Sequence, residues 1–401
     1  MSPFLPPLRT FCLLGAALLA IGMSAPSARA AATPAAGHWA AAWATAPQDV
    51  AAGTTLAFAQ VENQTIRQTV RLTLAGDQLQ VRLSNEYGTR PLRIGAASIS
   101  SKGQVRALTF GGGASIVIPP GAPAVSDPVS LPVARLGEAE ISLYLPDRTA
   151  IQTVHSTGLH TTLVSAPGDF TRQSEFPVTA RSSYRVFLTG VSVWATQPTQ
   201  VIAALGASIV DGFRSTVDTY GAWPDRLADR LAASSGVPTG VVNLGISGNR
   251  VTSDGGGVSA LARFDRDVLS QPGLTHMILF EGRNDLSLLP RDGADAQALF
   301  TAYQQIVHRA RQRGIKVIAA PVTPDGTTGW TDAQEAERRK LNALVRASTL
   351  FDGYIDFDAV LQNPAARGLK PAFDSGDHLH PNDAGYRAMG EAIDLKLFQA
   401  P

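Results

Sequence analysis

Cysteine is nearly absent from this chain, since Cys12 is the only one among 401 residues. It lies in an N-terminal segment that we expect to be removed, so the mature chain is predicted to have neither disulfides nor thiol chemistry. Beyond that segment no apolar run is long enough to span a bilayer. A chain without disulfides needs a large core to fold, and a hydrophobic content of 44% supplies one.

The chain also lacks an excess of either charge, with 34 Lys and Arg against 33 Asp and Glu. Removal of a leader that contains Arg9 and Arg29 and no acid leaves 32 basic residues against 33 acidic ones, a net charge of −1. A balanced composition of this kind does not indicate a polyanionic partner, so we expect no nucleic-acid binding.

The first 30 residues are typical of a secretory signal peptide. Arg9 precedes an apolar stretch, Phe11–Ile21, and Ala28-Arg29-Ala30 is an A-x-A cleavage site. We therefore predict a secreted or periplasmic protein without a stable membrane anchor. Residues 31–37, rich in Ala, are expected to form a flexible start of the mature chain.

Residues 38–196 are predicted to form an all-β accessory domain, a sandwich or jelly-roll. Thr69–Leu74 and Gln78–Leu83 alternate polar and apolar residues around Ala75-Gly76-Asp77, which predicts a hairpin with one wet face. Further short strand-like runs follow, separated by Gly, Pro and Asp: Ile94–Ile99, Ser115–Ile118, Glu140–Leu145 and Tyr184–Trp194. Many short strands with frequent turn signals favour a sandwich.

Residues 197–401 have a different pattern, in which apolar strands alternate with helices. The expected strands are Val201–Leu205, Val241–Leu244, Met277–Phe280 and Val317–Ala320. The expected helices are Trp223–Ala233, Leu261–Leu269, Asp295–Arg313 and Asp332–Ser348. This alternation predicts a three-layer α/β/α domain with a parallel sheet. Ligands of such sheets bind beyond the carboxyl ends of the strands.

Polar residues suited to nucleophilic catalysis stand where that site is expected. Ser208 follows the first of these strands at a strand-to-helix bend, where its hydroxyl and amide would both be accessible. Near the C-terminus His380 can act as its base, and Asp377, three residues earlier, can orient the imidazole. Asp374 is a rival for the acid. His378 is a rival for the base that we expect to line the rim instead.

Donors for an oxyanion are also present. The Ser208 amide is one candidate, Gly248 lies in a turn where backbone can approach a substrate closely, and Asn284 offers a side-chain amide past a strand end. Each residue taken alone also fits a plain role, such as an N-cap serine, a turn glycine or a turn asparagine. No group of His, Asp and Glu has recognisable metal-ligand spacing, so we expect neither a metal nor an organic cofactor.

The four segments together resemble the SGNH (GDSL-like) hydrolase family, whose four blocks carry Ser, Gly, Asn and His in this order. The segments are Gly206–Ile209, Gly245–Asn249, Glu281–Asp285 and Asp377–Pro381. Trp223-Pro224, Asn243 and Asp383–Tyr386 also look like the family, and the resemblance covers Val201–Leu397. It implies a flavodoxin-like fold for this half of the chain. The β-rich half is similar to that of exported arylesterases and xylan-associated acyl esterases in the same family.

Two residues depart from the family pattern. Ala207 stands where the family usually has the Asp of Gly-Asp-Ser, a carboxylate that helps to brace the nucleophile loop. Arg283 replaces a small or aliphatic residue before Asn284. We expect its guanidinium to pair with Glu281 or Asp285, with an acidic group on the substrate as the alternative.

The resemblance implies a secreted serine esterase that hydrolyses carboxylic esters through an acyl-enzyme, with Ser208, His380 and Asp377 as the triad. Its substrates would be acetylated carbohydrates or short-chain or aryl esters. An acyltransferase that uses a sugar hydroxyl is one alternative, because the same residues serve both reactions. A carbohydrate-binding protein on a decayed esterase fold, suggested by Ala207, is the other. The sequence does not predict the oligomeric state.

Overall fold

The computed structural model describes residues 37–50, 56–234 and 236–399. The predicted signal peptide lies outside these residues. These described residues form one compact unit. No helix among the described residues combines the length and the apolar character that crossing a membrane requires. The division of the chain into separate domains at residues 196 and 197 stays a prediction, since the two regions share a buried core, described below.

The region before residue 196 consists of antiparallel sheets. One has the order β1-β18-β5-β10, with β11 also on β5, and the other has the order β16-β15-β4-β12-β7-β8. The strands of the first are β1 (His38–Ala44), β5 (Gly76–Ser84), β10 (Pro123–Val125), β11 (Val129–Val133) and β18 (Leu188–Ala195). Those of the second are β4 (Gln64–Leu72), β7 (Ala96–Ser101), β8 (Gln104–Ala107), β12 (Gly137–Leu145), β15 (Thr162–Pro167) and β16 (Val178–Ser182).

Shorter strands close the ends of these sheets. They pair as β2 (Gln48–Asp49) with β14 (Thr153–His155) and β17 (Arg185–Val186), β3 (Gln60–Val61) with β13 (Thr149–Ala150), and β6 (Leu92–Ile94) with β9 (Ile116–Ile118). Side chains from both large sheets, such as Val70 and Ile141 of one and Leu83 and Val191 of the other, are buried in one cluster. The predicted sandwich-like β region is therefore what the chain forms.

The prediction that Thr69–Leu74 and Gln78–Leu83 form a hairpin is wrong. β4 and β5 follow one another directly, yet β4 pairs with β12 and β15 while β5 pairs with β18, β10 and β11. The connection at Thr73 crosses from one sheet to the other. Its backbone amide donates to the Ala42 carbonyl at 2.8 Å, and its hydroxyl and the Val241 amide are 3.0 Å apart. The alternation in both strands reflects burial in a core between sheets and says nothing of which strand is the partner.

The second region is a parallel sheet of five strands in the order β20-β19-β21-β22-β23. Its strands are β19 (Gln200–Gly206), β20 (Thr239–Gly245), β21 (Leu274–Phe280), β22 (Lys316–Ala319) and β23 (Gly353–Tyr354). Its helices are α1 (Ser208–Asp211), α2 (Trp223–Ala233), α3 (Ala260–Phe264), α4 (Arg283–Leu286), α5 (Ala296–Arg311), α6 (Asp332–Ala347), α7 (Phe357–Leu361) and α8 (Asp383–Ala392), with a π-helical turn at Asp265–Leu269 and a 3₁₀ turn at Leu395–Phe398. The four predicted strands and four predicted helices are all present.

Alternate residues of β19 enter two different cores. Val201 and Leu205 pack with side chains of α3, α5 and α6, whereas Ile202 and Ala204 pack with side chains of α2, α7 and α8. The sheet is thus covered on both faces, which confirms the three-layer prediction and explains why its strands are apolar almost throughout.

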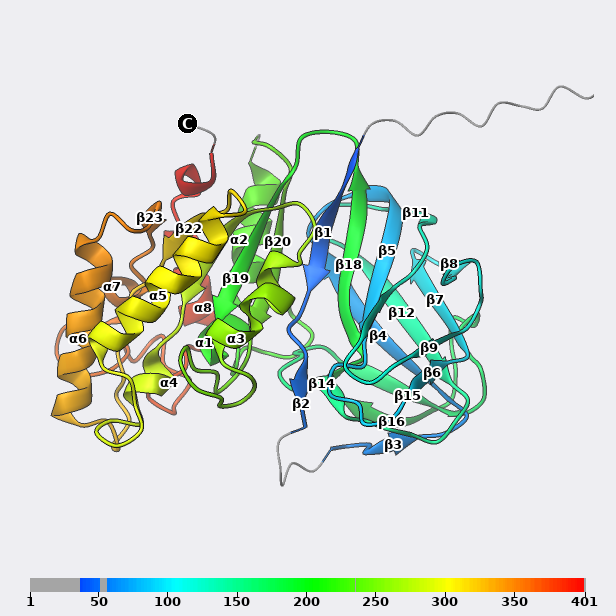
Figure 1. Ribbon diagram of the computed structural model, residues 1–401, viewed down its shortest axis with the longest axis horizontal. Helices are drawn as coiled ribbons and strands as arrows, with labels where there is room; N and C mark the ends of the chain where they lie inside the picture. Colours follow the sequence, from blue (N-terminus) through cyan, green and yellow to red (C-terminus); the bar gives the residue numbers. More distant parts are fainter. Residues whose placement is uncertain (1–36, 51–55, 235, 400–401) are drawn as a thin grey trace, which may run out of the picture. The chain divides into compact units, whose positions relative to one another are not determined.

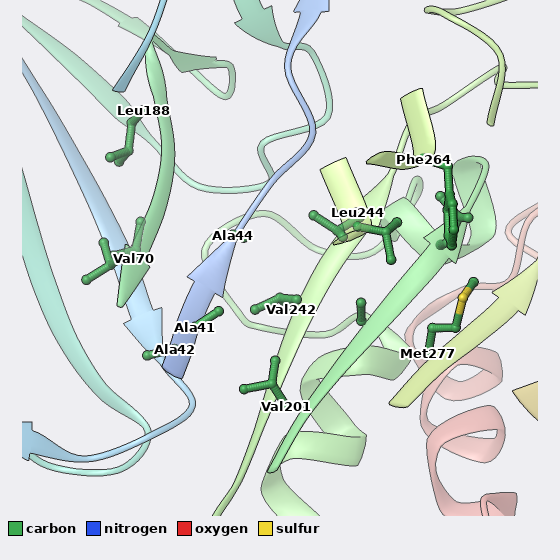
Figure 2. Close-up of a cluster of buried hydrophobic side chains, with 14 of the residues drawn as sticks. Ala41, Ala42, Ala44, Val70, Leu188, Val201, Val242, Leu244, Phe264 and Met277 are labelled. Carbon is green, nitrogen blue, oxygen red and sulfur yellow. The ribbon is translucent and has the colours of Figure 1, made fainter. Parts of the chain in front are cut away.

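The strand β1 joins the two regions (Figure 1). Its small side chains, among them Ala41, Ala42 and Ala44, lie between Val70 and Leu188 of the β region and Val201 and Val242 of the parallel sheet, as Figure 2 shows. Alanine lets the backbones approach closely, so a single hydrophobic cluster runs through both regions.

Candidate active site

Ser208 lies at the point where β19 ends and α1 begins. The strand finishes at Gly206, and Ser208 is the first residue of α1. A Cβ atom at Gly206 would come within 2.1 Å of the Phe280 carbonyl oxygen, so only glycine allows the strand end to lie so close to β21. The bend places Ser208 beyond the carboxyl end of the sheet, where open α/β sheets bind ligands.

The structure brings Ser208, His380 and Asp377 into one hydrogen-bonded chain. Ser208 Oγ lies 2.8 Å from His380 Nε2, and His380 Nδ1 lies 2.8 Å from Asp377 Oδ2. The ring of Phe213 packs edge-on against the imidazole, with 4.8 Å between centroids. These contacts orient Nε2 toward the serine hydroxyl and Nδ1 toward the acid, which is the arrangement that a serine nucleophile and its general base require.

The surroundings of Asp377 and His380 set the protonation states of both side chains. Burial alone would raise the pKa of Asp377, but hydrogen bonds from the His380 amide and ring and from the Leu379 amide bring its pKa well below the ordinary value. Burial lowers the pKa of His380, the Asp377 carboxylate opposes that shift, and the cations of Arg283 and Arg214 reinforce it. At neutral pH the acid is therefore ionised and the imidazole is neutral and able to accept a proton.

The rival residues form a separate pair. His378 Nδ1 lies 2.7 Å from Asp374 Oδ2, and the same carboxylate accepts the His378 and Gly376 amides through Oδ1. The His378 side chain is 63% exposed. Asp374 thus holds the loop and orients an exposed histidine, and it is not the partner of His380.

The predicted oxyanion donors differ in their surroundings. Across the described residues the amides of Ser208 and Gly248 donate to no protein acceptor. Gly248 has a φ of 79°, in a turn closed by a hydrogen bond from Asn249 to Ile246. Asn284 donates one Nδ2 hydrogen to the Asn249 carbonyl at 2.8 Å, which fixes its amide and leaves the second hydrogen for another acceptor. Ser208 and Asn284 line one pocket.

Asp211 is a site residue that the sequence did not reveal. Its Oδ2 accepts the Ser247 amide at 2.8 Å and the Ser247 hydroxyl at 2.7 Å, and so ties α1 to the turn that carries Gly248. Its Oδ1 lies 2.9 Å from Nε2 of His155, whose Nδ1 faces the Ala46 carbonyl at 3.0 Å. Both ring nitrogens face oxygen acceptors, so both contacts are hydrogen bonds only when the imidazole carries two hydrogens.

This arrangement bears on Ala207. The carboxylate that the family usually has at this position is missing. The Asp211 carboxylate lies one helical turn further on, is 2% exposed, and connects α1 to the Gly248 turn through its hydrogen bond with Ser247. A polar residue inside the otherwise apolar start of α1 is the one local signal that points to Asp211. Nothing near it in sequence points to His155, which comes from β14.

Buried charged residues hold the remaining loop backbone. The guanidinium of Arg263 donates to the Asn249 side chain at 2.9 Å, the Leu244 carbonyl at 2.8 Å and the Gly206 carbonyl at 3.3 Å. The Asp285 carboxylate accepts the Val251 amide at 2.9 Å, beyond the Gly248 turn. The segments that carry Ser208 and Gly248 are therefore fixed by groups that themselves cannot reach a substrate.

The prediction that Arg283 pairs with Glu281 or Asp285 is wrong. Its guanidinium pairs with the fully buried carboxylate of Asp325, to which Nε donates at 2.7 Å, and lies 5.2 Å above the ring of Trp330. Asp285 is occupied with backbone amides, and Glu281 is almost completely buried. Asp325 lies 42 residues further along the chain, so local spacing could not identify it.

A small pocket opens beside Ser208. Its apolar lining comes from Ala207, Ile209, Phe280, Val322 and Leu379, and its empty volume is about 350 Å³ including space open to solvent. Within the part of the chain that the structure describes, no three His, Cys, Asp or Glu side chains are grouped so that they could hold a metal ion.

Comparison with known families covers the same segments. Residues 204–388, which include Ser208, Gly248, Asn284 and His380, match the model of the GDSL-like Lipase/Acylhydrolase family. These residues form a GDSL-like acylhydrolase domain. The protein is accordingly a carboxylic ester hydrolase with a GDSL-like domain at residues 204–388. Among curated proteins nothing matches the chain.

Several solved structures are similar to the GDSL-like domain. A GDSL-like lipase from Bacteroides thetaiotaomicron VPI-5482 is 20% identical, covers 49% of this chain and 87% of its own, and has a TM-score of 0.37. An acetyl xylan esterase is 22% identical, covers 48% of this chain and 96% of its own, and has a TM-score of 0.38. A carbohydrate acetylesterase family member from Sinorhizobium meliloti is 16% identical, covers 48% and 94%, and has a TM-score of 0.39.

Proposed function

We propose that the protein is an exported serine esterase in which Ser208 is the nucleophile, His380 the general base and Asp377 the residue that orients the base. The observation that carries this proposal is the chain of two 2.8 Å contacts from Ser208 Oγ through the imidazole to the Asp377 carboxylate. A neutral imidazole at hydrogen-bond distance from a hydroxyl at a helix start is the condition for nucleophilic attack at neutral pH.

The reaction follows in two halves. Ser208 Oγ forms a bond to the ester carbonyl carbon while His380 Nε2 takes the hydroxyl proton. The tetrahedral intermediate then breaks its bond to the alcohol oxygen, and His380 returns the proton to the leaving alcohol. Water, deprotonated by His380, attacks the acyl-enzyme, and the carboxylic acid and Ser208 are released. Asp377 stays ionised throughout and stabilises the imidazolium.

The oxyanion is held by the backbone amides of Ser208 and Gly248 and by the free hydrogen of the Asn284 side chain. Neither amide donates to an acceptor within the part of the chain that the structure describes, and Asn284 is fixed by its hydrogen bond to Asn249. Donors that are already in place need no reorganisation when charge develops, and loss of one typically costs about 10²- to 10³-fold in rate.

The pocket supports a short acyl group. Its apolar side chains suit the methyl end of an acetyl or butyryl chain, and Phe280, at the end of β21, is one of its walls. We therefore propose acetylated carbohydrates, or short-chain or aryl esters, as the substrates. On the basis of the predicted signal peptide we also propose that this activity lies outside the cytoplasm, in keeping with a polymeric or extracellular substrate.

The test is hydrolysis of p-nitrophenyl acetate, butyrate and octanoate by the mature protein, beside Ser208→Ala and, as a matched control, Ser130→Ala at an exposed position of β11. We expect acetate to be the best substrate and kcat to fall at least about 10⁴-fold in Ser208→Ala alone. Ser208→Ala with unchanged turnover would remove the proposed nucleophile.

The same assay separates hydrolysis from acyl transfer when xylose or cellobiose is present. A hydrolase releases one carboxylate for each p-nitrophenol, whereas a transferase releases less carboxylate and forms an acylated sugar. Saturable sugar binding without any turnover would instead support the binding-protein alternative. The bracing of the loops by Asp211 favours the enzyme, because Ala207 does not leave the nucleophile loop without a buried carboxylate.

A further inference from the structure

A second cavity has a lining that includes Asp211 of α1 and none of the proposed catalytic residues. Its walls come from β1, from residues 155–160, from Arg185 and from the segment between α1 and α2, and its empty volume is about 590 Å³ including space open to solvent. Ser208, His380 and Asp377 do not line it. The cavity is unusual because basic side chains face it from inside the protein.

Arg185 is the central observation. The residue is 2% exposed and lines the cavity, and its Nε and Nη1 have no hydrogen-bond partner among the described residues. Its guanidinium lies 5.5 Å from the ring centroid of Trp43, which shields one of its faces. Burial lowers the pKa of Arg185 to about 10, so the group remains a cation at neutral pH. A buried cation that has no hydrogen-bonded counter-charge is costly, since its desolvation is not repaid.

Two more unsatisfied donors line the same cavity. Arg71 Nε and the Ser215 hydroxyl are buried without a partner in the described chain. Native proteins leave few buried polar atoms unpaired, so several in the wall of one cavity point to an acceptor that the protein itself does not supply.

The acidic groups near the cavity are already occupied or lie elsewhere. Asp211 is bonded to His155 and Ser247, and Asp229 pairs with Arg71 at 2.7 Å. Asp225, whose pKa burial raises to about 6, interacts with Arg71 and not with Arg185.

The charge of Asp218 raises the pKa of Arg185, but no carboxylate among the described residues is hydrogen-bonded to the Arg185 guanidinium. Asp218 binds the amide and hydroxyl of Thr161 with its two oxygens and is 52% exposed. Burial and the cation of Arg185 lower the pKa of His160 to about 4, so this imidazole is neutral. The phenol of Tyr220 is also uncharged, because burial raises its pKa. The open position in the cavity is therefore one for a negative charge.

We propose that this cavity binds a small carboxylate, held by the Arg185 guanidinium and the Ser215 hydroxyl. A planar carboxylate matches the fork of a guanidinium, and Arg is the usual residue for such recognition. The cavity accommodates an anion of the size of acetate, and inorganic phosphate presents similar oxygens. The site is separate from ester hydrolysis, so it does not depend on the proposed catalytic roles.

The experiment is calorimetric titration of sodium acetate, and separately of phosphate, into Ser208→Ala protein, at constant ionic strength so that screening does not change. Arg185→Met in the same background removes the charge and keeps the length of the side chain. Arg214→Met is the matched control, since Arg214 is an exposed guanidinium beside the catalytic Asp377. We expect one site, with affinity reduced at least about tenfold by Arg185→Met and unchanged by Arg214→Met.

The folding of the variants gives an independent readout. Without acetate, Arg185→Met should have a thermal midpoint at least as high as that of its parent, because it removes an unpaired buried cation. Acetate should raise the midpoint of the parent and not of Arg185→Met. Ser215→Ala, a smaller change, should weaken acetate binding severalfold and keeps the test open if Arg185→Met does not fold.

Three results would overturn the proposal: no saturable binding of acetate or phosphate, equal binding by Arg185→Met, or binding abolished by Arg214→Met alone. The last result would place the anion at the catalytic mouth. Preference for phosphate over acetate, with the same dependence on Arg185, would support the site and change only which oxyanion occupies it.

Discussion

Replacement of Asp211 by Asn should damage both the fold and the reaction. The carboxylate is 2% exposed and receives three hydrogen bonds of 2.7 to 2.9 Å, from the Ser247 amide, the Ser247 hydroxyl and His155. An amide of the same size has only one oxygen, so its NH₂ group must face either the Ser247 donors or the His155 ring. If the NH₂ group faces His155, it donates to Nε2 only when the ring proton is on Nδ1, and the neutral amide oxygen is a weaker acceptor than the carboxylate for the two Ser247 donors.

The magnitude follows from the loss of a charged acceptor. A hydrogen bond to a charged group contributes about 1.5 to 3 kcal/mol and a neutral one about 1 kcal/mol, so we expect Asp211→Asn to lower the unfolding free energy by about 2 kcal/mol. The turn with Gly248 would lose its anchor to α1, and a displacement of about 1 Å in an active site can cost about 10²-fold. We therefore expect kcat to fall about tenfold to a hundredfold with little change in KM.

The assay combines urea unfolding, followed by tryptophan fluorescence, with steady-state hydrolysis of p-nitrophenyl acetate. Asp229→Asn is the matched control, because that carboxylate pairs with Arg71 while 32% exposed and should contribute at most about 1 kcal/mol. In a double-mutant cycle, His155→Leu should lower the free energy of unfolding by less in the Asp211→Asn background than in the wild type. A change in unfolding free energy below about 0.5 kcal/mol together with unchanged kcat would refute the bracing role.

Three other perturbations have defined outcomes. The acidic limb of kcat/KM should lie below pH 6.5, because burial lowers the pKa of His380. Arg283→Met should move that limb to higher pH, since the Arg283 cation also lowers this pKa, and an unmoved limb would contradict the charge effect. Burial, and next the charge of Asp285, raises the pKa of Glu281 well above its ordinary value. The native state therefore keeps a proton that the unfolded chain releases, so the free energy of unfolding falls with rising pH by up to about 1.4 kcal/mol per pH unit. Urea titrations at several pH values should show that Glu281→Gln abolishes this fall. Gly248→Ala forces a side chain to adopt a φ of 79°, so it should lower the free energy of unfolding by about 1 kcal/mol and kcat about tenfold. Full activity of this variant would show that the turn tolerates a side chain.

Much of the α/β half could be predicted because its information is local. The apolar runs that became β19 and β20 and the helical segments that became α2 and α6 were predicted within a few residues of their observed bounds. The order of the four segments then indicated Ser208 and His380, which the structure brings within 2.8 Å of each other although 172 residues separate them.

The features that escaped prediction depend on contacts between distant segments. The strand β5 resembles a hairpin partner of β4, yet its partner β18 begins more than 100 residues later, and alternation alone fits either pairing. The same holds for His155 of the β region, which contacts Asp211. It also holds for Asp325, which pairs with Arg283 in place of the expected local carboxylates Glu281 and Asp285. A single sequence contains no signal for such pairs.

The central claim is that His380 activates Ser208 as the nucleophile, and covalent labelling tests it most directly. Diisopropyl fluorophosphate, followed by peptide mass spectrometry, should add one phosphoryl group to the mature protein, on Ser208. His380→Ala should slow that labelling by orders of magnitude while its folding, followed by circular dichroism, is kept. Labelling of a different serine with loss of esterase activity, or equal labelling rates in His380→Ala, would contradict the account.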